Sequence, residues 1–258
     1  MASPLDLASL TRALAGAGCV AADEEAEEIA RLARGPADAA RMLARRLTGE
    51  PLAWITGRAR FCGLDLAIEP GVYVPRWQSE PLAEKAAELL PARGQAVDVC
   101  TGAGAVALVM QTRRPGATVV ATEIDPDAVR CARANGITVY QGDLDAPLPA
   151  ALAGRVDVMT GVLPYVPRDA LHLLPRDVQR FEPRHALDGG DRGLEVLATL
   201  VGRSPRWVRP GGWLLLELGG DQVAAMTALT TAAGYRAVDV LVDDEGDPRG
   251  ICGQLQGS

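Results

Sequence analysis

The sequence lacks the features of a membrane protein, a metalloprotein or a disulfide-stapled domain. No apolar run in its 258 residues approaches the roughly 18 residues that a transmembrane helix needs. The N-terminal stretch has neither a basic leader nor an unbroken apolar segment, so we expect a cytoplasmic protein with no membrane partner. The five cysteines are scattered without C-x-x-C spacing, which predicts reduced thiols and no bound metal.

The sequence also has fewer basic than acidic residues. Lys and Arg number 26 against 33 Asp and Glu, which gives a formal net charge of −7. A protein that binds nucleic acid mainly through its phosphates needs the opposite balance, and we therefore expect no direct nucleic-acid partner. The remaining composition, 48% hydrophobic and 23% charged, is that of an ordinary globular protein.

The chain divides by composition into three parts. Residues 1–57 are rich in Ala, Leu, Glu and Arg with apolar residues at three-and-four spacing, which predicts a small helical domain. From Gly49 aromatic residues, β-branched residues and glycines become frequent, and we place a β-hairpin connector at residues 58–75. Residues 76–258 alternate apolar strands with helical segments, which predicts an α/β domain with a mainly parallel sheet covered on both faces.

The expected strands of this sheet are short and mostly apolar. They span residues 96–100, 118–124, 137–144, 155–162, 211–218 and 235–242. The expected helices between them include residues 79–90, 103–114, 126–135 and 221–234.

A glycine turn follows the first of these strands. The run from Asp98 to Gly104, DVCTGAG, ends the strand and opens a helix, and its two glycines let a ligand approach the backbone closely. A tight turn without a ligand would need the same residues. Glu123 ends the second strand about twenty residues downstream, where a carboxylate can bind both hydroxyls of a ribose. Asp143 ends the third strand, and the set fits either a nicotinamide cofactor or S-adenosylmethionine.

The loop distinguishes the two cofactors. Dinucleotide sites use a G-x-G-x-x-G turn that faces a pyrophosphate, whereas the D-x-C-x-G-x-G pattern resembles class I methyltransferases. That resemblance implies a Rossmann-like seven-stranded domain, with S-adenosylmethionine as cofactor and S-adenosylhomocysteine as product. It implies that the loop packs on the methionine part, Glu123 on the ribose and Asp143 on the adenine amino group. Cys100 stands where many members have a glycine. The implied cofactor-binding residues are Asp98, Cys100, Thr101, Gly102, Ala103, Gly104, Glu123, Ile124, Asp143 and Leu144.

Further motifs narrow the resemblance. The runs GEPL from Gly49, G-x-x-x-F-x-G from Gly57, VPR from Val74, FEP from Phe181 and ALDGG from Ala186 are similar in order and spacing to the HemK/PrmC-type protein-(glutamine-N(5)) methyltransferases. This implies a small N-terminal helical domain joined by a hairpin to the methyltransferase domain. The implied substrate is the Gly-Gly-Gln loop of a peptide chain release factor, docked with help from the helical domain and hairpin. The residues expected to flank this substrate are Pro75, Arg76, Phe181 and Glu182.

The catalytic motif departs from the family pattern. Members carry Asn-Pro-Pro-Tyr after the fourth strand, and the aligned residues here are Val162, Leu163, Pro164 and Tyr165. In the family the Asn side-chain oxygen and the next residue's carbonyl accept hydrogen bonds from the substrate NH₂, while the Tyr ring packs against the amide. Such positioning supplies much of the rate. Leu163 keeps its carbonyl, but Val162 has no side-chain acceptor, and one unpaired buried donor costs about 1–3 kcal/mol.

Three functions are therefore compatible with the sequence. The chain transfers a methyl group to a protein glutamine amide; or it methylates a different acceptor, such as a hydroxyl, carboxylate or amine of a small molecule or another protein; or it is a non-catalytic interaction protein that binds the cofactor. Asp169, His172 and His185 are candidate general bases near the motif, although exposed loop positions explain them more simply.

Overall fold

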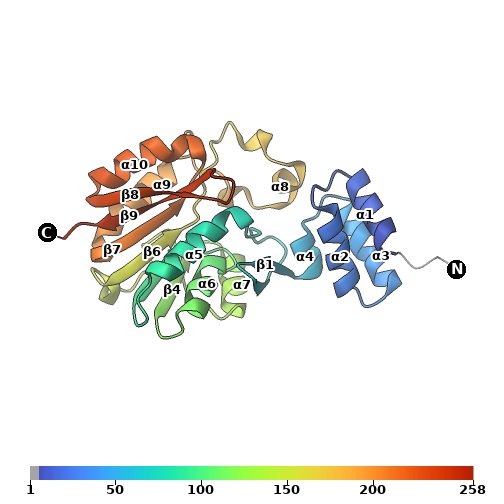
Figure 1. Ribbon diagram of the computed structural model, residues 1–258, viewed down its shortest axis with the longest axis horizontal. Coiled ribbons are helices and arrows are strands. Elements are labelled where there is room, and N and C mark those ends of the chain that lie inside the picture. Colours follow the sequence, from blue (N-terminus) through green and yellow to red (C-terminus); the bar gives the residue numbers. More distant parts are fainter. Residues whose placement is uncertain (1–5, 258) are drawn as a thin grey trace.

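The structure is a computed structural model that describes residues 6–257, and it has a small helical lobe and a larger α/β lobe (Figure 1). Residues 1–5 and 258 of the predicted domains lie outside the described part. The helical lobe has its own apolar core, to which Leu10, Ile29 and Leu43 contribute from three different helices. Its helices are α1 (Leu7–Gly16), α2 (Ala22–Leu32), α3 (Pro36–Arg46) and α4 (Leu52–Thr56).

A β-hairpin joins the two lobes. Strands β1 (Arg58–Phe61) and β2 (Leu64–Ala67) pair antiparallel, and their inward side chains Phe61 and Leu66 are buried in the core of the larger lobe. Trp54 of α4 strengthens the junction, because its ring meets that of Phe181 edge-on at 6.2 Å between centroids. Within the described residues, helices α1–α4 lie between Leu7 and Thr56, and the two hairpin strands lie between Arg58 and Ala67.

The larger lobe is built on a seven-stranded sheet in the order β5-β4-β3-β6-β7-β9-β8. The first five strands in this order are parallel, and β9 and β8 are antiparallel to their neighbours. The strands are β3 (Gln95–Val99), β4 (Thr118–Glu123), β5 (Thr138–Gln141), β6 (Val156–Gly161), β7 (Val208–Glu217), β8 (Tyr235–Val242) and β9 (Pro248–Leu255).

The sheet agrees with the predicted strands except at β9. That strand reads PRGICGQL, and its two glycines and polar ends hide the apolar alternation by which strands are recognised. It is nevertheless paired on both sides, with β7 and β8. The predicted third strand is shorter than expected, since the chain leaves the sheet at Gln141.

Helices cover both faces of the sheet, as Figure 1 shows. One core layer joins the sheet to the first three of the sheet-covering helices, and the other joins it to the last two. These helices are α5 (Glu80–Leu89), α6 (Ala105–Arg113) and α7 (Pro126–Ala134), then α9 (Glu195–Arg203) and α10 (Val223–Ala232). The short helix α8 (Arg176–Phe181) lies in the long connection between β6 and α9. Short 3₁₀ turns occupy Trp77–Ser79, Ala150–Leu152, Leu171–Leu173, Arg184–Ala186, Ser204–Arg206 and Gly220–Gln222.

This topology decides where a site can form. The parallel strands all end at one edge of the sheet, and this edge is where the loops after β3, β4 and β6 come together. None of the described helices combines the length and apolar character needed to cross a bilayer.

Gly104→Ala should lower the free energy of unfolding by about 1–3 kcal/mol. Gly104 has φ +89°, and an added Cβ would lie 2.9 Å from Ile137 Cγ1. Gly202 in α9 is the matched control, since a Cβ there meets nothing within 4 Å. Gly202→Ala should raise stability by roughly 0.5–1 kcal/mol through helix propensity. Urea unfolding measures both, and equal effects would contradict this account of the turn.

Candidate cofactor and acceptor site

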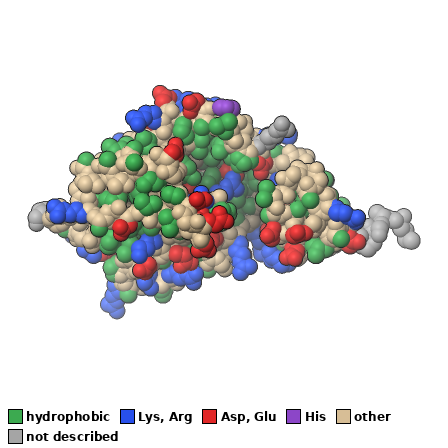
Figure 2. All heavy atoms as spheres, turned by 45° about the horizontal axis from the view of Figure 1, so that its top comes forward, with side chains coloured by type: hydrophobic (Ala, Val, Ile, Leu, Met, Phe, Trp, Pro, Cys, Tyr) green, Lys and Arg blue, Asp and Glu red, His purple; other side chains and the backbone are tan. Residues whose placement is uncertain are grey.

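A cavity of about 660 Å³ lies at the carboxyl edge of the parallel strands. Figure 2 shows the surface hollowed between the two lobes, with hydrophobic and charged side chains meeting there. Cys100 and Gly102 line the cavity after β3, Glu123 and Ile124 at the end of β4, and Val162 after β6. The volume is in the range of ordinary small-molecule sites, which is about 300–1,000 Å³.

Asp98 links the two halves of this site. Its carboxylate accepts a hydrogen bond from Thr101 Oγ1 in the glycine loop at 2.6 Å and from Thr160 Oγ1 in β6 at 2.7 Å. The side chain is only 1% exposed. Burial raises the pKa of Asp98 to about 6, with both threonine hydroxyls acting in the opposite direction. The loop expected to bind the cofactor and the strand that leads to Val162 therefore share one buried anchor.

Glu123 organises the backbone around the cavity. Its Oε2 accepts from the Gly102 amide at 2.8 Å, and its Oε1 accepts from the amides of Ile124 and Asp125 at 2.8 and 3.0 Å. A carboxylate has about four acceptor positions. The three backbone bonds leave one position for a ligand hydroxyl, so Glu123 both shapes the loop and can bind a ribose.

The open space around this loop fits S-adenosylmethionine. At Gly102, φ is +57° and a Cβ would meet nothing within 4 Å, so the backbone there faces free space. Ile124 is 53% exposed at the cavity wall, where it offers an apolar surface for a base. Glu123 accepts hydrogen bonds from the amides of both residues and also lines the cavity. The loop, the acid and the apolar wall are thus arranged for a nucleoside with an extended side chain.

The other residues predicted to bind cofactor are distributed unevenly. Cys100 lines the cavity with φ +57°, a region that favours glycine, which explains why a glycine is common there in the family it resembles. Thr101 and Ala103 line a small adjoining pocket rather than the main cavity. Asp143 is exposed and Leu144 is buried after β5, and neither lines the cavity.

The predicted acceptor loop is tightly held. Its four residues, Val162 to Tyr165, all line the cavity, and Val162 packs on the core of the larger lobe. The ALDGG segment runs beside the loop: the Val166 amide donates to the Leu187 carbonyl at 3.1 Å, and the Gly189 amide to the Val166 carbonyl at 2.9 Å. A Cβ at Gly189 would lie 2.7 Å from Tyr165 Cα. The segment therefore supports the acceptor loop from behind.

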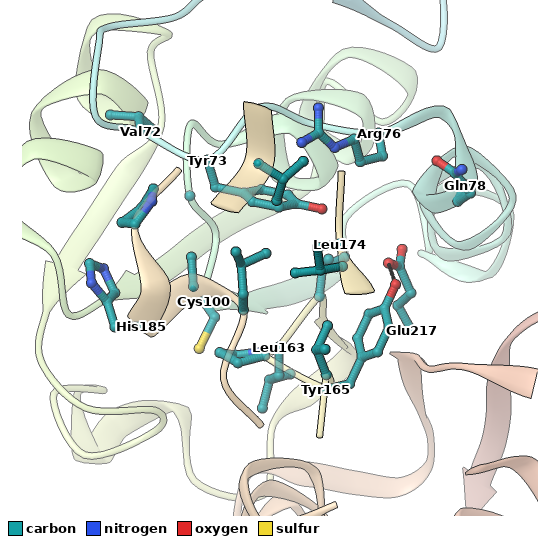
Figure 3. Close-up of a pocket in the computed structure, with 18 of the residues that line it drawn as sticks. Val72, Tyr73, Arg76, Gln78, Cys100, Leu163, Tyr165, Leu174, His185 and Glu217 are labelled. Carbon is teal, nitrogen blue, oxygen red and sulfur yellow. Dashed lines mark hydrogen bonds between the residues drawn. The ribbon is translucent and has the colours of Figure 1, made fainter. Parts of the chain in front are cut away.

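The sequence did not point to Glu217, which lies beside Tyr165, or to Tyr73, which lies beside Arg76. The Tyr165 hydroxyl donates to Glu217 Oε1 at 3.1 Å (Figure 3). Arg76 lies over the Tyr73 ring, 5.4 Å from its centroid. Burial raises the pKa of Glu217, while neighbouring hydroxyls including that of Tyr165 oppose this. A glutamate within the apolar run LLLEL was the available sequence signal for Glu217.

Of the four predicted substrate-flanking residues, Arg76 alone lines the main cavity. Arg76 lines the cavity and pairs with the buried Glu182, which joins the VPR and FEP motifs. Phe181 and Glu182 do not line the main cavity, and Pro75 lines only the small adjoining pocket. Their placement indicates that they hold Arg76 and the helical lobe in position.

The three candidate bases do not share one location. Asp169 and His172 are exposed and lie outside the cavity lining. His185 lines the cavity, with Nε2 3.0 Å from Asp125 Oδ2. In Figure 3 it lies across the cavity from Glu217. His185 is therefore at the cofactor loops rather than at Tyr165.

Known proteins resemble this chain in sequence and in fold. The methyltransferase small domain model matches residues 78–144. A release factor glutamine methyltransferase from Moorella thermoacetica is 40% identical over 216 residues, which cover 80% of this chain and 75% of that protein. The one from Geobacter sulfurreducens is 33% identical over 220 residues, with 83% and 76% covered.

The chain belongs to the release factor glutamine methyltransferase family. A methyltransferase structure from Pyrococcus furiosus, 20% identical, has a TM-score of 0.53 and covers 84% of this chain and 100% of that one, which supports the same fold. The predicted family and the Rossmann-like fold are thus confirmed, and the protein is a methyltransferase of the S-adenosylmethionine-dependent type.

Asp98→Asn should remove a pH dependence from the stability of this methyltransferase. Folding raises the pKa of Asp98 from 3.8 to about 6, so the native state binds more protons than the unfolded state between these values. Stability is therefore lost as the pH rises through this window, by about 3 kcal/mol for a difference of about two pH units.

The variant should not show this loss in urea unfolding at about pH 4 and pH 7. Asp65→Asn removes an exposed carboxyl and is the control, expected to follow the wild-type protein. Identical pH profiles for the Asp98 variant and the wild-type protein would contradict the buried anchor.

Proposed function

We propose that this protein transfers a methyl group from S-adenosylmethionine to the side-chain amide nitrogen of a glutamine in a peptide chain release factor. The observation that carries the proposal is the acceptor loop, which places Tyr165 and the Leu163 backbone beside the loops for the cofactor in one cavity. Membership in the glutamine methyltransferase family favours this acceptor over the hydroxyl, carboxylate and non-catalytic alternatives.

S-adenosylmethionine, when bound, supplies the methyl group and leaves as S-adenosylhomocysteine. We assign Glu123 to the ribose, the loop from Asp98 to Gly104 to the methionine part, and Ile124 to one face of the adenine. Asp143 would have to reach the adenine from its exposed position after β5. The substrate nitrogen gains the methyl group and loses one proton, which passes to the solvent.

The substrate amide needs alignment because its nitrogen is a poor nucleophile. The Leu163 carbonyl can accept one N–H, and the Tyr165 ring can pack against the amide plane. Val162 accepts nothing through its side chain, so the second N–H lacks the partner that Asn provides in the family pattern. We therefore expect a slow enzyme rather than an inactive one, with a rate of methyl transfer lowered by about one to two orders of magnitude.

A protein substrate suits the rim of the cavity. Val20, in the turn between α1 and α2, is fully exposed and contributes to the cavity lining, so the helical lobe forms part of the entrance. Trp77, from the larger lobe, also lines the cavity and is 55% exposed. Exposed apolar side chains around an entrance favour a protein partner over a small molecule. We propose that residues 1–57 and the hairpin dock the release factor in the cytoplasm.

Incubation with a release factor and labelled cofactor tests the proposal. Label should appear on the glutamine of the Gly-Gly-Gln loop, and a release factor with that glutamine changed to alanine should stay unlabelled. Cofactor binding by calorimetry without any labelling of release factor would reject the assigned acceptor. Labelling of small metabolites in its place would favour the alternative enzyme.

Val162→Asn should raise kcat/KM for the release factor by about 10- to 100-fold, because the new side-chain oxygen pairs the second amide N–H. Val162→Ala is the matched control, since it opens space without adding an acceptor, and its kcat/KM should not rise. Steady-state kinetics with varied release factor measures both. An equal gain in the two variants would mean that volume rather than hydrogen bonding limits the reaction.

A further inference from the structure

The turn after β7 holds Tyr165 at both ends. Glu217 Oε1 accepts from the Tyr165 hydroxyl at 3.1 Å, and Gln222 Nε2 donates to the Tyr165 carbonyl at 2.8 Å. Gln222 Nε2 also donates to the Gly193 carbonyl at 3.1 Å, and its Oε1 accepts from the Gly219 amide at 2.9 Å. The Gln222 amide thereby holds the Tyr165 backbone, and Glu217 restrains rotation of the Tyr165 side chain.

Burial of the Glu217 carboxylate costs folding free energy. It is the last residue of β7, between Leu216 and Leu218 in the sequence, and is 2% exposed. One carboxylate oxygen, Oε2, has no partner in hydrogen-bond geometry among the residues that the structure describes, although the nearby Ser79 hydroxyl opposes the rise in the pKa of Glu217. Such an unpaired oxygen destabilises the folded state, and an apolar residue would suit the position better. Stability therefore does not explain Glu217, whereas its place in the cavity lining does.

We propose that Glu217 is a positioning residue for methyl transfer, which fixes the ring of Tyr165 against the substrate amide. This rests on the proposed function and deepens it. Because Val162 offers no acceptor, alignment of the amide depends on the Leu163 carbonyl and on the Tyr165 ring. A freely rotating ring would remove half of that remaining alignment.

Two substitutions at Glu217 separate positioning from packing. Glu217→Leu removes the acceptor, whereas Glu217→Gln keeps an oxygen for the Tyr165 hydroxyl. The leucine variant should lower kcat about tenfold, equivalent to about 1.4 kcal/mol, with KM for S-adenosylmethionine unchanged. The glutamine variant should stay within about threefold of wild type. Glu88→Leu, at an exposed position on α5, is the control and should leave kcat unchanged.

Thermal unfolding and a double-mutant cycle complete the test. The Tm of Glu217→Leu should stay close to that of wild type, because removal of a buried carboxylate offsets the loss of the acceptor for the Tyr165 hydroxyl. In the Tyr165→Phe background, Glu217→Leu should have no further effect on kcat, since both changes remove the same hydrogen bond. A lowered Tm in step with lost activity, or additive effects on kcat, would overturn the proposal.

A readout without turnover separates this proposal from the assigned acceptor. The chain has four tyrosines, so 3-fluorotyrosine labelling gives a short ¹⁹F spectrum in which Tyr165→Phe identifies one signal. Glu217→Leu should shift or broaden the Tyr165 signal, and Glu88→Leu should not. If the wild-type enzyme labels no release factor, the assigned acceptor fails on its own. An unmoved Tyr165 signal would overturn the positioning role whatever the acceptor is.

Discussion

The site depends on one buried carboxylate. Asp98 receives hydroxyl hydrogen bonds from Thr101 in the glycine loop and Thr160 in β6, so it sets the distance between the cofactor loop and the acceptor loop. Parallel strands bring their ends to one edge of the sheet, but they do not fix loops to one another. The reaction requires that the methyl donor and the amide be aligned, and this shared anchor supplies the frame on which both are built.

Much of the fold could be predicted from the sequence, because alternating strands and helices leave a strong local pattern. The family motifs also predicted the loops around the cavity, because their glycines and prolines mark backbone turns that are visible in the sequence. The strand and the residues that the sequence did not predict were hidden for physical reasons. β9 is held by pairing on both sides rather than by its own propensity, so its glycines concealed it. Glu217 and Gln222 act through contacts with Tyr165 across more than fifty residues, which no local pattern records.

The structure also changes the meaning of several motifs. Arg76 at the cavity wall pairs with the buried Glu182, and the ALDGG segment supports the acceptor loop through backbone bonds. These motifs therefore hold parts of the site in position within the described structure. Val162 replaces the Asn of the family pattern, at the position where a side-chain hydrogen bond to the substrate would form. The fold of the family surrounds a cavity in which Val162 offers no side-chain acceptor.

A crystal structure with S-adenosylhomocysteine and a Gly-Gly-Gln peptide is the most direct measurement of this account. It should place the glutamine amide on the Tyr165 ring, with one N–H on the Leu163 carbonyl and the nitrogen directed at the cofactor sulfur. The second N–H should face Val162 without a protein acceptor. A glutamine bound elsewhere, or a cavity in which Tyr165 has turned away from Glu217 to exclude the amide, would contradict the account.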